Sequence, residues 1–296
     1  MRHLLRQFNE ELTALVTTIL PSTVTITATS EDLSGGHSGS GWVYNNGLVV
    51  TNHHVLHGMV DPIHVRPVGA PQLIGTLVGG DPENDIAVLR VPGLKAQPIP
   101  LELVQPRLGE LCVAIGSPHG LPESASFGII SGLSRQSQHP DGAIIEEMLQ
   151  TDASVNPGSS GGPLVNIEGR LLGMNTMGTA ETVNLAVSAE TIAAIVPELI
   201  AHGSIARACL GISVAARQGS AGGGGGIEVT RVRVEQPEGL QKGDILRCIN
   251  GRPIRRRVDV VRALSRAVID QTVVIEVERQ GQSLMLSVQA RRRDPG

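Results

Sequence analysis

Residues 23–187 alternate short runs of β-branched and aliphatic residues with clusters of turn-forming residues. Gly, Pro, Asn or Asp separates many of the runs, and these residues favour turns over the interior of a strand. A long series of short strands is typical of a sandwich or a barrel. The runs that we expect to form strands are residues 23–27, 48–51, 73–78, 86–91, 111–115, 127–130, 171–174 and 184–187.

The composition agrees with a mainly β protein that has more than one domain. Aromatic residues make up 1% of the chain and Gly occurs 36 times, so the core must come mainly from Val, Ile, Leu and Ala. A chain of 296 residues is long enough for two domains, each with its own core. The net charge is only −4 and no basic stripe occurs, which argues against a nucleic-acid-binding protein.

The N-terminal residues predict an amphipathic helix that ends at Pro21. A signal peptide would need an unbroken apolar stretch and a small-residue cleavage site, and no run approaches the roughly 20 apolar residues of a membrane span. As the sequence stands we expect a cytoplasmic protein; the alternative is a periplasmic or cell-envelope protein whose leader was removed. The apolar positions at helical spacing are Leu4, Leu5, Phe8, Leu12, Leu15, Val16 and Ile19.

A second helix and a change of composition mark a domain boundary. Ser188 is a candidate N-cap, Gly203 a candidate C-cap, and Pro197 should bend the helix between them. The rest of the chain has its own strands, at 227–232, 244–249, 273–277 and 284–288, and a helix at 258–268. We therefore expect one domain over residues 1–203, a linker over 204–207 and a second domain over 208–296.

Several features that suggest a ligand have a simpler explanation. Gly-rich residues 222–226 lack the Lys-Ser/Thr ending of a phosphate loop and are typical of a surface loop. Three neighbouring histidines have no acidic or cysteine partner at ligand spacing, so we expect no metal and no cofactor. The cysteines are scattered in apolar runs, which favours reduced core residues over disulfides. These residues are His53, His54 and His57, and Cys112, Cys209 and Cys248.

Three segments together indicate acyl-transfer chemistry. N-P-G-S-S-G-G-P-L-V at 156–165 places Ser160 among glycines, which let the backbone bring N–H groups near a nucleophile. T-N-H-H-V at 51–55 offers an imidazole to take the serine proton, and D-P-E-N-D-I-A-V-L at 81–89 offers a carboxylate to orient that imidazole. By itself, the serine segment could be a Gly-rich turn, the histidine a structural residue and the aspartate a cap. The joint occurrence of the three segments favours catalysis.

The order His, Asp, Ser resembles that of trypsin-fold proteases, and the segments resemble the HtrA family motifs T-N-x-H-V, D-x-A-V-L and T-D-A-x-x-N-P-G-x-S-G-G-P-L. The second part of the chain resembles a bacterial PDZ domain. The resemblance implies a mainly β fold, with a chymotrypsin-like double β-barrel protease domain followed by a small α+β PDZ domain. The supporting segments are residues 39–41, 114–118, 210–212, 239–246 and 249–251.

Carried over to this sequence, the resemblance makes His54 the general base, Asp85 its orienting acid and Ser160 the nucleophile. The N–H groups of Gly158 and Ser160 would form the oxyanion hole. His53 competes with His54, but only His54 directly precedes the Val of the motif. Likewise Ser154 and Ser159 compete with Ser160, and only Ser160 is followed by Gly-Gly-Pro.

The resemblance also implies roles in specificity and regulation. Ser159 stands where digestive trypsin-like zymogens use an Asp to bind a new N-terminus, so activation should come from loop ordering. Ser154 would line the base of the specificity pocket, where the absence of a carboxylate favours a small or medium aliphatic residue before the cut. In the PDZ domain a peptide C-terminus would bind at Cys209, Leu210, Gly211 and Ile212, with Val258 and Val261 lining an apolar pocket.

The first hypothesis is therefore an ATP-independent endopeptidase that cleaves unfolded or damaged proteins. The implied partners are unfolded polypeptides, peptide C-termini and, by family analogy, two further copies in a homotrimer, with neither a nucleic acid nor a membrane span involved. A second hypothesis is a polypeptide-binding scaffold or holdase with little cleavage. A third is an esterase for small acyl substrates, which would have no need of a peptide-binding domain.

Overall fold

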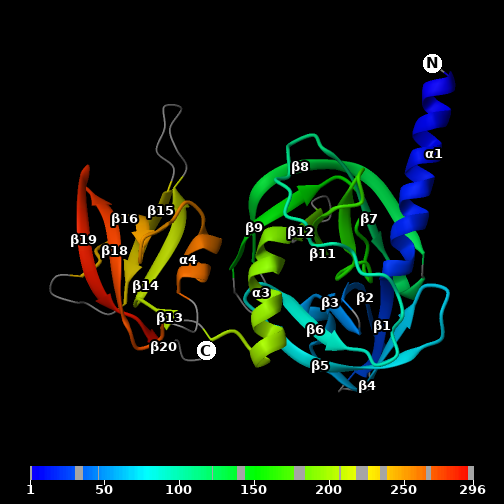
Figure 1. The fold of residues 1–296 in the computed structure, drawn as a ribbon, viewed down its shortest axis with the longest axis horizontal. Helices are drawn as coiled ribbons and strands as arrows, with labels where there is room; N and C mark the ends of the chain where they lie inside the picture. Colours follow the sequence, from blue (N-terminus) through cyan, green and yellow to red (C-terminus); the bar gives the residue numbers. More distant parts are fainter. Residues whose placement is uncertain are drawn as a thin grey trace. The chain divides into compact units, whose positions relative to one another are not determined.

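The computed structural model describes residues 2–30, 36–45, 47–121, 123–138, 144–176, 184–206, 208–217, 226–233, 239–264 and 268–292. The chain divides into two compact units, Met1–Ser204 and Ile205–Gly296 (Figure 1). The fold is mainly β, as the sequence predicts. The Gly-rich segment 222–226 lies, except for Gly226, outside the described residues.

The first half of unit one is a closed, antiparallel six-stranded barrel. Its interior is aliphatic, with Ile26, Val43, Val49, Val65 and Leu89 fully buried, because strand side chains alternate between the inside and the outside. In barrel order the strands are β1 (Thr23–Ser30), β2 (Gly36–Asn45), β3 (Leu48–Thr51), β6 (Ile86–Arg90), β5 (Leu73–Asp81) and β4 (Met59–Pro67).

A second closed six-stranded barrel follows in the same unit (Figure 1). Its core holds Ile130, Leu164, Leu172 and Ala186, again without aromatic residues. Two closed barrels leave few exposed strand edges, since closure pairs each strand on both sides. In barrel order the strands are β10 (Pro163–Asn166), β11 (Leu171–Thr176), β12 (Asn184–Ser188), β9 (Ile144–Thr151), β8 (Ser124–Gln138) and β7 (Leu111–Gly116).

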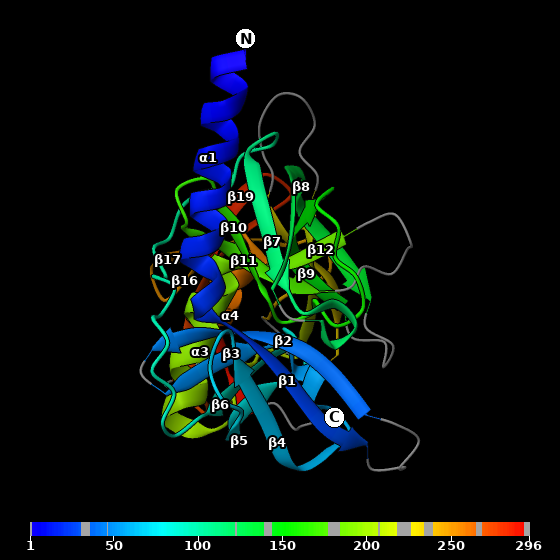
Figure 2. The same cartoon turned by 90° about the vertical axis from the view of Figure 1, so that its right-hand side faces the viewer.

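Both predicted helices of this unit form. Helix α3 (Ala189–His202) begins where the Ser188 hydroxyl accepts the Thr191 N–H at 3.2 Å, and ends at Gly203 in the left-handed region at φ 73°. Helix α1 (Arg2–Ile19) stands beside the second barrel (Figure 2). The Phe8 ring contacts the Phe127 ring edge to face, with 5.6 Å between the ring centroids. Of the helices that the structure describes, none has the length and apolar character needed to cross a bilayer.

Unit two is a sheet with one described α-helix, α4 (Arg257–Ala263), which is the first part of the helix expected at 258–268. Strand β14 forms one edge of the sheet, and α4 lies next to it. The sheet order is β14 (Ile212–Arg217), β15 (Gly226–Val232), β16 (Ile245–Ile249), β18 (Thr272–Arg279) and β19 (Gln282–Gln289); β17 (Arg252–Pro253) pairs with β16, and β13 (Ala208–Cys209) with β20 (Arg291–Arg292).

The eight strands predicted between residues 23 and 187 all form. The sequence analysis did not predict β2, β4, β9 and β10 of unit one or β14 of unit two, because these segments lack a clear strand pattern. Strand β2 shows why, because glycine has little strand propensity. A Cβ on Gly39 would lie 2.8 Å from Val55 Cγ2, and one on Gly41 would lie 2.7 Å from Val49 Cγ1. The glycines of β2 thus allow close packing inside the barrel, which a propensity argument cannot detect.

Candidate active site

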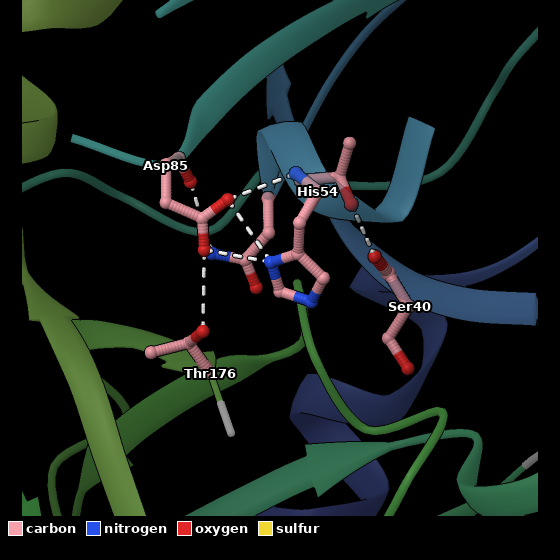
Figure 3. A network of polar contacts seen from close by, with 6 residues as sticks. Ser40, His54, Asp85 and Thr176 are labelled. Carbon is pink, nitrogen blue, oxygen red and sulfur yellow. Dashed lines mark hydrogen bonds and ion pairs between the residues drawn. The ribbon is translucent and has the colours of Figure 1, made fainter. Parts of the chain in front are cut away.

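The barrel topology brings His54 and Asp85 together. Strands β3 and β6 pair with Thr51 opposite Ala87, so the residues just after β3 lie beside those just before β6. His54 belongs to the short helix α2 (His53–Leu56), and its Nδ1 lies 2.8 Å from Asp85 Oδ2 and 3.0 Å from Oδ1 (Figure 3). The sheet thus brings together two residues that are 31 positions apart in the sequence.

Asp85 is almost fully buried, at 1% exposure, and its carboxylate is well bonded. Besides the imidazole it accepts the backbone N–H of His54 at 2.9 Å and the Thr176 hydroxyl at 3.2 Å, while the Asn52 amide donates to the Asp85 carbonyl at 3.0 Å (Figure 3). Asp85 adopts φ 54°, an uncommon value for a residue with a side chain. A buried ionised carboxylate needs such donors, because it has lost its water.

The same bonds define how the imidazole of His54 is protonated. An ionised carboxylate can only accept hydrogen bonds, so Nδ1 of His54 carries a hydrogen toward Asp85. In the neutral ring Nε2 is then left as the acceptor. His53 lies elsewhere: a Cβ on Gly80 would be 2.6 Å from its Nδ1, so its ring packs on strand β5. Of the two histidines, His54 is the one paired with Asp85.

Ser160 lies in the turn at residues 156–162 that leads into β10, and it is buried. Four consecutive carbonyl groups of this turn each accept a hydrogen bond, which fixes the orientation of four peptide planes. The donors are the His119 N–H to Pro157 (2.8 Å), the Ser40 hydroxyl to Gly158 (2.7 Å), the Gly162 N–H to Ser159 (3.1 Å) and the Ser40 N–H to Ser160 (2.8 Å).

The N–H groups of the turn differ from one another. Those of Ser159, Gly161 and Gly162 donate to carbonyl groups within the protein. Within the described part of the chain, the N–H groups of Gly158 and Ser160 have no such acceptor. Because C=O and N–H point in opposite directions across a trans peptide, the bond from His119 to the Pro157 carbonyl directs the Gly158 N–H away from His119. Two unused donors beside one serine are what an oxyanion requires.

Strand β11 connects the turn to the acid. The Asn175 carbonyl accepts the Gly161 N–H at 2.8 Å, and the next residue, Thr176, donates to Asp85. On the other side, the Thr51 hydroxyl donates to the Ser40 carbonyl at 2.7 Å (Figure 3). Our sequence analysis did not identify Ser40 or Thr176 as site residues. Ser40 lies in a G-S-G segment that resembles the family, whereas no local pattern singles out Thr176.

Ser154 and Ser159 line a cavity of about 210 Å³ next to the turn at residues 156–162, which we call the nucleophile turn after the expected role of Ser160. Small side chains form most of its wall, and the Ser126 hydroxyl donates to the Ser154 carbonyl at 2.7 Å. Among the described residues that line it, none is acidic.

In unit two, the expected carboxylate-binding residues form the entry to strand β14. Cys209 ends β13, the Leu210 side chain is buried in the core, Gly211 has φ 71°, and Ile212 begins β14. The Arg233 N–H donates to the Gly211 carbonyl at 2.6 Å. The side chains of Val258 and Val261 lie outside the described part of the structure, although their backbone belongs to α4.

Two closed barrels with a His-Asp pair and a serine turn between them define a trypsin-like serine protease. In agreement, a model of the trypsin-like peptidase domain matches residues 39–174, and a PDZ domain model matches residues 208–290. The solved structure "HtrA-type protease AlgW with tripeptide" is 30% identical, with a TM-score of 0.76 over 95% of this chain and 97% of that one. The chain belongs to the HtrA family of serine proteases.

Longer curated proteins are also similar. "Protease Do-like 1, chloroplastic" from Arabidopsis thaliana is 34% identical over 276 residues, and "Probable periplasmic serine endoprotease DegP-like" from Marinomonas sp. (strain MWYL1) is 31% identical over 280 residues. The alignments cover 85% and 87% of this chain. They span 63% and 58% of the two relatives, so this chain corresponds to only part of their length.

Proposed function

We propose that this protein is an ATP-independent serine endopeptidase that cleaves unfolded or damaged proteins, with His54, Asp85 and Ser160 as its catalytic triad. The observation that carries the proposal is the His54–Asp85 pair, with 2.8 Å between Nδ1 and Oδ2, in which the Asp85 side chain is buried and the His54 side chain is 31% exposed. A carboxylate held in this way keeps the imidazole in the tautomer that can accept a serine proton. Membership of the HtrA family supports the same reaction.

In the proposed reaction, Ser160 Oγ attacks the carbonyl carbon of the scissile bond while Nε2 of His54 takes the serine proton. The negative charge that develops on the carbonyl oxygen is stabilised by the N–H groups of Gly158 and Ser160. His54 then gives its proton to the leaving amine, and water repeats the sequence to release the acid. Peptide hydrolysis needs no nucleotide, and the sequence offers no phosphate loop.

We propose that residues 1–203 form the protease domain, residues 204–207 a linker, and residues 208–296 a PDZ domain that binds peptide C-termini. The exposed edge of the sheet at β14, with α4 beside it, supports strand addition by a peptide. For the protease domain, the small, non-acidic side chains around Ser154 favour a small or medium aliphatic residue before the cut.

Family analogy implies a homotrimer, and we include it in the proposal. Leu4 and Leu5 of α1 are exposed, and association would remove such apolar surface from water. Sedimentation of the full chain should then give three times the chain mass of 31.0 kDa. A monomer would overturn the trimer but would leave the catalytic assignment intact.

Turnover of casein by the wild type and by Ser160→Ala tests the proposal. We expect cleavage by the wild type and a loss of several orders of magnitude in the variant, since only binding and the oxyanion hole remain. Casein that is bound by both forms and cut by neither would indicate the holdase instead. Equal cleavage by both forms would show that Ser160 is not the nucleophile.

A further inference from the structure

Ser40 joins the first barrel to the nucleophile turn, and its N–H, carbonyl and hydroxyl are all hydrogen-bonded. It is fully buried in strand β2, at 0% exposure. Its N–H donates to the Ser160 carbonyl at 2.8 Å, and its carbonyl accepts the Thr51 hydroxyl. Its hydroxyl donates to the Gly158 carbonyl at 2.7 Å and accepts the Ser117 N–H at 2.8 Å. One residue thus bonds to both sides of the turn.

These bonds act on the peptide groups next to the two unused donors. The hydroxyl of Ser40 fixes the carbonyl of Gly158, and its N–H fixes the carbonyl of Ser160. Gly158 adopts φ 96°, a value that glycine reaches easily and also leaves easily, because it has no side chain to restrict it. Without the hydroxyl of Ser40, the carbonyl of Gly158 would lose its partner, and the torsion that relates this carbonyl to the Gly158 N–H would be less restricted.

We propose that Ser40 is a positioning residue for the oxyanion hole. This inference rests on the proposed function, because it assigns Ser40 a part in the same reaction. Ser40 contacts none of the reacting atoms; it acts through the Gly158–Ser159 and Ser160–Gly161 peptide groups, each of which directly follows a residue that carries one of the two donors. Donors that are fixed before the reaction stabilise an oxyanion without having to reorganise during it.

Thr25 provides a matched control. It lies directly opposite Ser40 in the pairing of β1 with β2, and it is buried. Its hydroxyl shares a hydrogen bond with the Ser117 hydroxyl at 2.7 Å. Thr25→Val therefore removes a buried hydroxyl from the same cluster without removing a bond to the nucleophile turn. If Ser40 positions the oxyanion hole, substitutions at Ser40 should lower kcat and Thr25→Val should not, even where both lower the stability of the fold by a similar amount.

The experiment compares Ser40→Ala, Ser40→Cys and Thr25→Val with the wild type, in the full chain and with fluorescent casein as substrate. Cys retains a side-chain γ atom but forms only weak hydrogen bonds, so it covers the case in which Ser40→Ala does not fold. For both Ser40 variants we expect kcat to fall about 10- to 100-fold with KM within about twofold, because the loss is confined to the transition state. Thr25→Val should keep near-normal kcat, and its Tm should fall by about as much as that of the Ser40 variants.

A peptidyl boronic acid ending in valine gives a second readout, because its tetrahedral adduct places an anionic oxygen in the hole. Its affinity should fall by about the same factor as kcat in the Ser40 variants and stay unchanged in Thr25→Val. If the folded Ser40 variants kept the wild-type kcat, or if Thr25→Val lost as much kcat as they do, the role of Ser40 would be overturned and the proposed function would stand. A wild type that does not exceed Ser160→Ala would overturn the proposed function as well.

Discussion

The two units differ in how their candidate sites are built. In unit one, buried side chains from distant segments are bonded to one another: Asp85 to His54 and Thr176, and the nucleophile turn to Ser40. In unit two, the candidate site is the edge of β14, whose residues are half-buried or exposed, next to α4. Catalysis needs fixed polar groups at defined positions, whereas strand addition uses backbone groups that every residue carries.

This difference also affects what single substitutions should do. A change in a bonded network propagates to each of its members, while sites without shared partners give independent effects. Substitutions in the network around Asp85 should therefore affect catalysis without affecting peptide binding by unit two. Substitutions at the PDZ domain should affect peptide binding without affecting catalysis.

The largest effect is expected from Asp85→Asn. The amide keeps the shape but presents an N–H to His54, which favours the wrong tautomer, so kcat should fall about 10⁴-fold. Peptide binding by unit two should not change. Kinetics on casein and fluorescence titration with a C-terminal peptide measure the two quantities.

Glu83→Gln is the control for this variant, because it removes a carboxylate from the same turn but not the partner of His54. It should retain near-normal kcat. If Asp85→Asn kept a tenth or more of the wild-type activity, the pair would not have the role that its geometry indicates.

The next effect is a loss of stability in unit two. Asp244 is buried and accepts Arg279 Nε and Nη2 at 2.7 and 2.8 Å and the Gln241 N–H at 2.7 Å, and this bonding raises the pKa of Arg279. Asp244→Asn leaves that cation without its counter-charge, which should lower the free energy of unfolding of this unit by about 2–4 kcal/mol. Urea unfolding of the full chain, followed by circular dichroism, measures the shift.

Glu278→Gln is the matched control for the stability measurement. Glu278 pairs with Arg247 at 2.6 Å, but the two side chains are 37% and 34% exposed. A pair open to water contributes about 0–1 kcal/mol, so the control should have a small effect. Equal losses in the two variants would show that burial does not distinguish these two ion pairs.

How much the sequence predicts depends on whether the signal is local. The eight strands expected from apolar runs between residues 23 and 187 all form. The triad residues stand in short motifs, and their catalytic roles stay predictions. Thr176 and Ser40 act across 91 and 118 residues of sequence, and such contacts exist only after the barrels close. In unit two, α4 was predicted, but the pocket at Val258 and Val261 stays a prediction, because spacing alone does not separate a pocket from a core.

A smaller effect should follow from the chemistry of the peptide C-terminus. Full-length Ser160→Ala, which cannot cleave its ligand under the proposed mechanism, is titrated with a peptide that ends in a free apolar residue and with its amidated form. Amidation should weaken binding about tenfold or more, since backbone N–H groups bind a carboxylate more strongly than a neutral amide. Equal affinities for the free-acid and the amidated peptide would show that unit two does not bind the terminal carboxylate.

The smallest effect is expected from Thr176→Val. This variant removes one of several donors to Asp85 and leaves His54 in place, so kcat should fall only about fivefold, the equivalent of roughly 1 kcal/mol. Steady-state kinetics on casein measures it. A loss as large as that of Asp85→Asn would mean that the hydroxyl of Thr176 controls the pair, contrary to the distribution of bonds around the carboxylate.

We expect the His54–Asp85 pair to activate Ser160 and no other serine. Labelling with a fluorophosphonate, followed by peptide mapping, tests it most directly, because the reagent reacts with an activated serine without any assumption about the natural substrate. We expect one adduct, on Ser160, in the wild type and in Ser159→Ala, no adduct in Ser160→Ala, and labelling slowed by orders of magnitude in His54→Ala. An adduct on Ser159 or Ser154, or labelling of Ser160 at the wild-type rate in His54→Ala, would contradict the account.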